Sequence, residues 1–221
     1  MQLQPLFDFL ADLSAHNERT WFQDHKATYT QLRAQFETEV GHLFAEMREI
    51  DPVLAGPDGR QSIFRIYRDV RFSKNKDPYK THFSAYFTAS PGKDVDAPAY
   101  YFQLGPHGRT FIGAGIYQPD RAQLAAIRQE IDYNADPLQD LLAARSYQDY
   151  YAGLSGEKLK KAPKDYPADH PAIDLLRHKS FIASQELSDE TALALPDWRG
   201  YVREAFQAAV PLCNYLREAI G

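Results

Sequence analysis

The spacing of apolar residues changes near residue 60, and this change limits the folds that the chain can adopt. Before it, from Tyr29 to Met47, apolar side chains recur every three or four residues, as on one face of a long helix, and Phe22 lies seven residues before Tyr29 on the same face. After it, residues 63–72 and 81–89 alternate with a period of two, which is typical of β-strands. These patterns, followed by further helical ones, predict an α+β domain in which helices cover a mainly antiparallel sheet.

The first predicted hairpin pairs residues 62–72 with residues 81–89 through a lysine-rich loop. Alternation places four apolar side chains on the face toward the core, namely Phe64, Ile66, Phe83 and Phe87. The opposite face of the second strand then carries His82 and Tyr86. The sequence therefore predicts one apolar and one polar face for this pair.

Three further strands complete a predicted sheet of about five strands. They cover residues 100–104, 109–117 and 179–184, and the first two form a hairpin through a Gly-Pro-His-Gly turn. Gly113 and Gly115 lie on one face, where the missing side chains leave room for a ligand or a crossing helix. Of these two explanations, we favour packing.

The remaining patterns predict helices, including a long N-terminal one and a C-terminal one. Asn17 is expected to cap the long helix, and Pro211 to kink the last one. The helical segments are 3–13, 17–50, 119–133, 137–144, 172–178 and 198–220, with a short one starting at Ser188. No linker divides the chain, so we expect a single domain over residues 1–221.

A second unusual feature is a concentration of positive charge in an acidic chain. Residues 60–82 contain seven Lys or Arg and two Asp, a net charge of +5, whereas the whole chain carries −5. A local positive field on an acidic body attracts anions, and arginine forks and lysines bind phosphate or carboxylate groups. The alternative is structural: a salt-bridge network on one sheet face beside a solvated lysine loop.

We select charged and aromatic residues of this region, with a second basic loop, as candidate ligand-binding residues. The candidates are Arg65, Arg68, Asp69, Arg71, Lys74, Lys76, Lys80, Tyr86, Tyr101, Lys158, Lys160, Lys161 and Lys164. We expect part of the first stretch to converge with the loop 158–164 on one anion-binding cleft. The converging residues are Arg71, Lys74, Lys76, Lys80 and His82. Arg65 and Arg68 should each also stabilise the fold by about 1–3 kcal/mol through partners on their strand.

His82 is the candidate general acid or base, because an imidazole titrates near neutral pH. Nearby cations should disfavour its protonated form, and a single histidine on a strand is more often structural. The tyrosines on the open sheet face, Tyr67, Tyr86 and Tyr101, are suited to stack on a base or sugar. The alternative is that they cover the sheet beneath a helix.

The sequence predicts no metal site and no cofactor. It contains no HExxH pattern, no pair of cysteines and no phosphate-binding P-loop. Ser73-Lys-Asn-Lys76 matches the S-x-x-K string of some acyl enzymes, but that motif opens a helix and this one follows a predicted strand. Cys213 lies on the apolar stripe of the last helix and is expected to be buried rather than reactive.

One cysteine in 221 residues indicates a reducing compartment, and we expect a cytoplasmic protein. The N-terminus lacks the charged and apolar regions of a signal peptide. No stretch approaches the roughly 20 apolar residues of a membrane span, so no membrane partner is expected. The sequence makes no prediction of the oligomeric state.

One stretch resembles the signature of the DUF2461 family of uncharacterised intracellular proteins. It reads Arg65-Ile-Tyr-Arg-Asp-Val-Arg-Phe-Ser-Lys-Asn-Lys-Asp-Pro-Tyr-Lys-Thr-His82. Further blocks of the family fall in similar order along nearly the whole chain, at 17–22, 100–102, 113–115 and 159–164. The resemblance implies no catalytic residue. Asp165 stands where the family pattern has glycine, and its carboxylate should weaken the anion affinity of the second basic loop.

Three functions from different classes stay open at this point. The first is an anion-binding protein, including an enzyme that acts on a phosphorylated or nucleotide-like small molecule. The second is a nucleic-acid-associated protein, which the acidic remainder of the chain disfavours. The third is a non-catalytic scaffold that docks an acidic partner. A concave pocket at Arg65 and Arg71 would favour the first, a long open groove the second and a flat patch the third.

Overall fold

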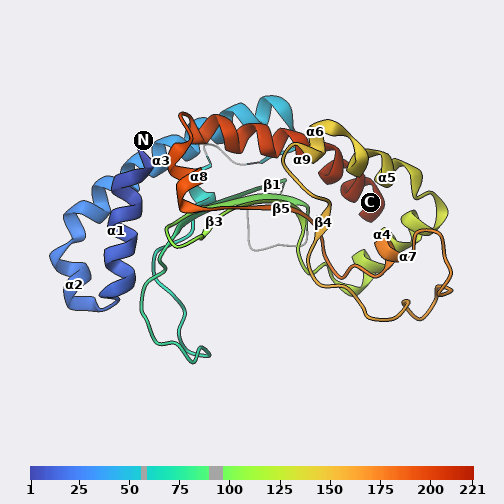
Figure 1. The fold of residues 1–221 in the computed structure, drawn as a ribbon, viewed down its shortest axis with the longest axis horizontal. Coiled ribbons are helices and arrows are strands. Elements are labelled where there is room, and N and C mark those ends of the chain that lie inside the picture. Colours follow the sequence, from blue (N-terminus) through green and yellow to red (C-terminus); the bar gives the residue numbers. More distant parts are fainter. Residues whose placement is uncertain (56–58, 90–96) are drawn as a thin grey trace.

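A computed structural model describes residues 1–55, 59–89 and 97–221. Their strands form one antiparallel sheet with the order β1-β2-β3-β5-β4 (Figure 1). The strands are β1 (Phe83–Thr88), β2 (Ala99–Leu104), β3 (Thr110–Ile116), β4 (Leu154–Ser155) and β5 (Phe181–Leu187). The predicted α+β class and the predicted number of strands are confirmed.

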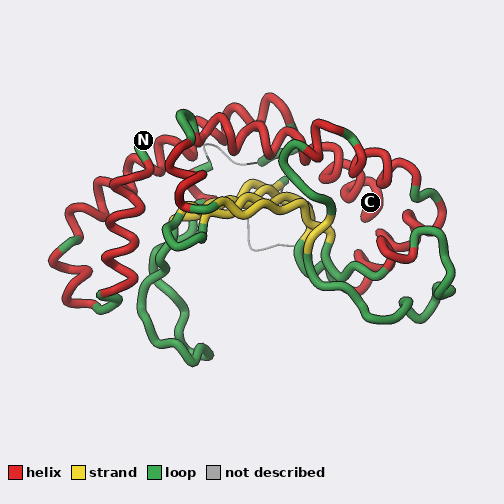
Figure 2. The backbone as a smooth tube through the Cα atoms, in the orientation of Figure 1, coloured by secondary structure: helices red, strands yellow, loops and turns green. Residues whose placement is uncertain are grey.

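Long helices cover one face of this sheet. α3 and α9 lie along that face, and the opposite face is turned toward the hollow side of an arched molecule (Figure 1, Figure 2). The helices are α1 (Leu3–Ala15), α2 (Arg19–Asp24), α3 (Lys26–Ile50), α4 (Arg121–Tyr133), α5 (Asp136–Ala143), α6 (Arg145–Gln148), α7 (Ile173–Leu176), α8 (Asp189–Ala194) and α9 (Trp198–Ile220), and a 3₁₀ turn, η1, covers Arg60–Ser62. Pro211 lies inside α9.

The core lies between the sheet and the two long helices. Phe83 and Phe87 of β1 are buried in it, as predicted. Their rings pack against Phe36 and Phe44 of α3, with centroid distances of 5.4 and 5.1 Å. Because successive side chains of a strand point to opposite faces, burial of these residues leaves their neighbours on the open face.

The predicted long helix is broken at His25, and Asn17 does not cap it. α2 follows Glu18, which makes no side-chain cap bond. The Asn17 side chain is bonded instead to the backbone of Tyr79, donating to the carbonyl oxygen (3.1 Å) and accepting from the N–H (3.0 Å). Asn17 therefore pairs with an extended segment, and this tertiary contact overrides its preference for a helix cap.

The predicted strand at 62–72 is wrong. Isolated bridges, rather than a continuous ladder, link this segment to the chain that follows it. Residues 63–82, which we call the arm, leave the sheet as two adjacent extended segments and project away from it (Figure 2). Backbone hydrogen bonds join the two segments, such as the one from the Lys80 N–H to the Ile66 oxygen (2.7 Å).

Burial in the arm does not follow the predicted alternation. Ile66 is buried as predicted, but Phe64 is 39% exposed and Phe72 is 95% exposed. Ile66 and Tyr79 of the arm still contact the core, whereas Phe64 and Phe72 do not enter it, so the alternation of apolar residues is not matched by burial. The fifth strand is β4 at the opposite edge of the sheet, which the sequence pattern does not predict.

A buried ion pair ties the end of α3 to α9 and β2. Arg217 donates to both carboxylate oxygens of Asp51, at 3.1 and 2.6 Å, and the Tyr100 hydroxyl donates to the same carboxylate at 2.6 Å. Asp51 is 3% exposed.

Burial raises the pKa of the nearby Cys213 thiol to about 12. The thiol is therefore protonated at neutral pH, in line with the expected unreactive cysteine.

We predict that Asp51→Asn lowers the free energy of unfolding by about 2–4 kcal/mol, because the neutral amide removes the charge that pairs with Arg217 and leaves one acceptor oxygen in place of two. Urea unfolding followed by circular dichroism measures this change. The matched control is Asp140→Asn, which alters an exposed aspartate and should change stability by less than about 0.5 kcal/mol. Equal midpoints for the two variants would contradict the role given to Asp51.

Candidate functional site

The open face of the sheet displays the side chains that alternate with those of the core. Strand register aligns them in rows that cross the sheet. One row consists of Tyr86, Tyr101, Gly113 and Ser184. The next row, nearer the arm, consists of Ser84, Gln103, Phe111 and Glu186. Two predicted candidates, Tyr86 and Tyr101, are thus direct neighbours.

Four aromatic rings form a continuous platform on this face, which we call the aromatic platform. Phe64 of the arm contacts Tyr86 and Tyr101, with centroid distances of 5.3 and 6.0 Å, and Tyr101 contacts Phe111 at 5.9 Å. The rings of β1, β2 and β3 are partly exposed. The sequence pattern did not mark Phe64 and Phe111 as site residues, because alternation placed Phe64 in the core and no pattern singled out Phe111.

The two glycines of β3 serve packing, in line with the explanation that we favoured. A Cβ at Gly113 would lie 2.8 Å from the Phe111 ring, so the missing side chain lets that ring lie over the strand. Gly115 has a φ of +121°, and a Cβ there would lie 2.1 Å from the Phe181 oxygen of β5. Glycine is required at that position by both the backbone conformation and the close approach of β5.

Basic side chains gather where the arm meets the platform. The Lys80 ammonium lies 4.8 Å from the centre of the Phe64 ring, and burial, with the charge of Arg65, lowers the pKa of Lys80. Burial also lowers the pKa of His82, to about 4, with help from the charges of Lys80 and Arg109. The His82 imidazole is therefore neutral at pH 7, as its cationic neighbours led us to expect.

Asp69 and Arg71 form an exposed ion pair on the arm. The guanidinium donates to the carboxylate at 2.7 and 3.0 Å, and the Arg71 backbone N–H adds a bond of 3.2 Å. These hydrogen bonds lower the pKa of Asp69 to about 2. An exposed pair contributes little to stability, so these two candidates fit the structural alternative.

Arg68 and Lys76 also bond within the arm. Arg68 donates to the Asp77 oxygen and Lys76 to the Val70 oxygen, both at 3.0 Å. Arg65 differs from them, because it is exposed and no carboxylate of the described chain lies within ion-pairing distance of it. The partners expected for Arg65 are therefore absent among the described residues, and the expected loss of stability remains only for Arg68.

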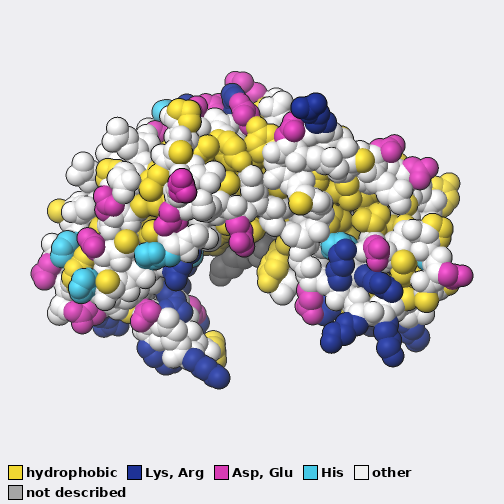
Figure 3. Space-filling model, viewed as in Figure 1, with side chains coloured by type: hydrophobic (Ala, Val, Ile, Leu, Met, Phe, Trp, Pro, Cys, Tyr) yellow, Lys and Arg dark blue, Asp and Glu magenta, His cyan; other side chains and the backbone are white. Residues whose placement is uncertain are grey.

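The second basic loop lies in a different part of the molecule. It follows β4 and runs antiparallel to residues 177–179, where Lys158 bridges to His178. Its candidate lysines are all exposed: Lys158, Lys160, Lys161 and Lys164. Figure 1 places this loop and the arm on two separate legs of the arch, and Lys and Arg side chains gather at the end of each leg (Figure 3). The structure does not bring the two basic segments together in one cleft.

His178 is buried behind the second basic loop. It is 1% exposed, and its Nδ1 atom has no hydrogen-bond partner among the described residues. Burial, followed by the charge of Lys158, lowers its pKa to about 4. The sequence did not indicate a buried histidine here, because the neighbouring Arg177 and Lys179 suggest an exposed position.

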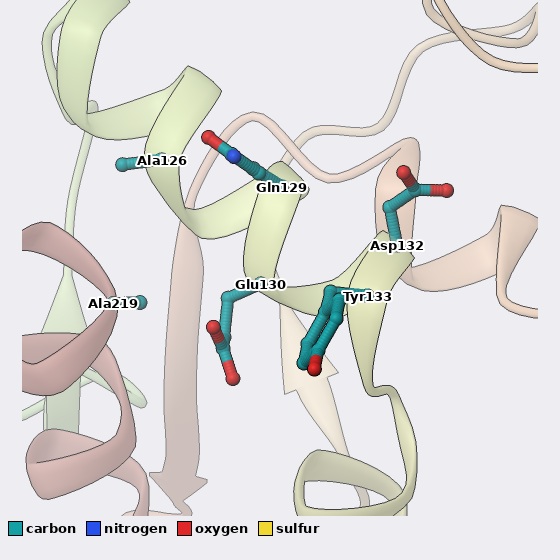
Figure 4. A pocket seen from close by; sticks show the side chains of 6 residues that line it. All are labelled: Ala126, Gln129, Glu130, Asp132, Tyr133 and Ala219. Atoms are coloured by element: carbon teal, nitrogen blue, oxygen red, sulfur yellow. The ribbon is translucent and has the colours of Figure 1, made fainter.

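Two hollows elsewhere on the molecule contain none of the candidate residues. One has a volume of about 370 Å³ and is lined by Ala126, Gln129, Glu130, Asp132 and Tyr133 of α4 and by Ala219 of α9 (Figure 4). The other has a volume of about 330 Å³ and includes Leu142 of α5 and Leu175 of α7. The first presents two carboxylates and no cation, so it does not suit an anion.

In the ranges that the structure describes, no group of three His, Cys, Asp or Glu side chains is placed to hold a metal ion. None of the helices within those ranges combines the length and the apolar character needed to cross a bilayer. The candidate site consists of the aromatic platform, the adjoining part of the arm and the basic side chains beside them.

The fold and this surface define an α+β protein with an antiparallel sheet that is covered on one face and carries aromatic and basic side chains on the other. The chain belongs to the DUF2461 family, described as "Conserved hypothetical protein", whose model matches residues 5–215. The resemblance noted in the sequence is thus confirmed over nearly the whole chain. No curated protein and no solved structure matches it.

The base of the arm is held by Asn17 and by Phe22, whose ring stacks on Tyr79 at 4.0 Å. We predict that Asn17→Ala speeds hydrogen exchange of the Arg68 and Lys80 amides by roughly fivefold or more, because two hydrogen bonds that hold the arm are lost. Exchange followed by mass spectrometry tests this.

The control for that experiment is Asn134→Ala, at an exposed asparagine after α4, which should leave exchange in the arm unchanged. If Asn17→Ala has no effect on the arm either, Asn17 does not anchor it.

We predict that stability falls as the pH drops from about 6.5 to about 4. A histidine with a depressed pKa binds fewer protons when folded than when unfolded, so its contribution is complete above the unfolded pKa and is lost toward the folded one. Replacing His178 by Gln should reduce this loss by on the order of 1–3 kcal/mol. Urea unfolding at a series of pH values measures it, and His42→Gln, at an exposed histidine, should leave the profile unchanged. A profile that His178→Gln does not alter would refute the prediction.

Proposed function

We propose that this protein binds a ligand that carries both a phosphate and a planar ring, at the junction of the arm and the open sheet face. The observation that carries the proposal is the position of the Lys80 ammonium, 4.8 Å from the Phe64 ring, where Phe64 is part of a four-ring platform. A nucleotide-like molecule matches both chemistries, since its base stacks on aromatic rings and its phosphate pairs with cations.

The charges at this junction support an anionic ligand. Lys80 and Arg65 make no ion pair with any carboxylate that the structure describes. Lys80 is partly buried, whereas Arg65 and Arg109 are exposed. The positive charges of these three side chains repel one another, at a cost that is largest for Lys80, and an anion relieves it. Arg68, Asp69, Arg71 and Lys76 are better explained as the internal bonds of the arm, and Lys74 lies in solvent on it.

His82 extends this proposal to catalysis. An imidazole that is neutral at pH 7 is available to accept a proton from a ligand held at the same junction. In the enzymatic form of the proposal, His82 is therefore the general base for a phosphorylated or nucleotide-like substrate. In the non-catalytic form it only donates or accepts a hydrogen bond.

We predict that AMP binds with an affinity that falls by about 10- to 100-fold in Arg65→Ala and in Lys80→Ala, because each substitution removes a charge-assisted contact. Isothermal titration calorimetry measures this, with ribose 5-phosphate and adenosine as probes of the phosphate and the ring alone. Both should bind more weakly than AMP.

The matched control is Arg145→Ala on α6, where the arginine side chain is 95% exposed, and it should bind AMP as the parent protein does. AMP that fails to bind at millimolar concentration, or that binds equally to all variants, would refute the proposed function.

A further inference from the structure

We propose that the ligand of this face is a single strand of nucleic acid, which runs from the arm across the aromatic platform to the second basic loop. This inference rests on the proposed function and adds the size and class of the ligand. It follows from where the two basic segments leave the sheet, from the cations in each that form no ion pair with a described carboxylate, and from the aromatic face between them.

The two basic segments are attached to opposite edges of the sheet. The arm leads directly into β1, and the second basic loop directly follows β4, which are the two outer strands in the order β1-β2-β3-β5-β4. Four strand spacings of about 4.8 Å separate these edges by roughly 19 Å. A mononucleotide held at Lys80 does not extend to the lysines of the second loop, whereas a polymer of nucleotides does.

The lysines of the second loop are available to an anion. Glu157, the acidic residue just before this loop, is paired with Lys179 at 2.7 Å. Lys158, Lys160, Lys161 and Lys164 are exposed and form no ion pair within the described residues. Asp165 beside them reduces the local field and does not cancel it. The loop therefore offers a second group of phosphate contacts, matching the arm across the hollow (Figure 3).

The surface between the two legs suits unpaired bases. Phe64, Tyr86, Tyr101 and Phe111 present partly exposed rings, and Gly113 adds no side chain above the sheet. Bases of a single strand stack on such rings, as they do on other sheet faces that bind RNA. A duplex hides the faces of its bases and cannot make these contacts. Glu186, an exposed carboxylate on the same face, repels phosphate groups over the sheet. The phosphates are therefore expected to contact the cations of the two legs.

The experiment measures binding of fluorescein-labelled 12-nucleotide oligo-U and oligo-dT by fluorescence anisotropy, beside a 12-base-pair duplex and unlabelled UMP as competitor. Both single strands should bind more tightly than the duplex and than UMP. Phe64→Ala should weaken binding of the 12-mer by about 5- to 100-fold, and Phe64→Trp should preserve it.

Lys160→Glu and Lys161→Glu separate the polymer from the mononucleotide. Each should weaken the 12-mer and lower the slope of log affinity against log salt by about 0.7, while leaving UMP unchanged, because UMP does not reach the second loop. Arg145→Glu, on α6 at the outer side of the arch (Figure 1), reverses one charge away from the hollow and should alter neither. Circular dichroism melting verifies that each variant is folded.

The possible failures are distinguishable. If UMP binds through Arg65 and Lys80 but the 12-mer binds no more tightly and ignores Lys160→Glu, the strand inference falls and the proposed function stands. If neither probe binds, both fall. Preference for the duplex, or 12-mer binding that Phe64→Ala does not weaken, overturns the inference as well.

Discussion

The structure depends on a sheet that the helices of the described ranges cover on one face (Figure 1). α3 and α9 pack on that face, and the alternation of side chains along β1, β2 and β3 then decides which residues enter the core and which remain on the open side. Phe83 and Phe87 stabilise the fold by burial, while Tyr86 and Tyr101, which are paired neighbours on β1 and β2, lie on the open face. The same constraint that builds the core therefore builds the surface to which we assign a function.

The arm adds to this surface what a sheet alone cannot provide. It carries Phe64 over the open face and Lys80 next to that ring, and it is held in place by the paired hydrogen bonds of Asn17 with Tyr79. Its other charged residues bond mostly within the arm. Asp69 with Arg71 and Arg68 with the Asp77 carbonyl stabilise the shape of the arm. A dense basic stretch thus contains both structural charges and charges left for a ligand, which composition alone does not separate.

The distribution of charge explains how an acidic protein can present a basic site. The net charge of −5 belongs to the whole chain, whereas Lys and Arg gather at the ends of the two legs (Figure 3). Fields of exposed charges are screened within about 8–10 Å at physiological salt, so a ligand in the hollow responds to the legs more than to the distant acidic residues. The acidic residues outside the two basic segments disfavoured nucleic-acid binding when only the sequence was considered. Their distance from the hollow in the structure makes this objection weaker.

The sequence by itself determined the α+β class, the strands 81–89, 100–104 and 109–117, and the outward position of Tyr86 and Tyr101. It also determined the helices that the structure has as α1, α4 and α9. It could do so because those segments are buried on one face, and burial imposes the period that the pattern reveals. Only the tertiary structure decided the rest. It turned 62–72 from a strand into an arm, gave Asn17 a partner 62 residues away, and placed the two basic loops on separate legs. Side chains of an arm in solvent need not alternate between apolar and polar, so their spacing does not predict its conformation. Contacts between residues far apart in the chain do not affect local spacing, so the sequence pattern does not reveal them.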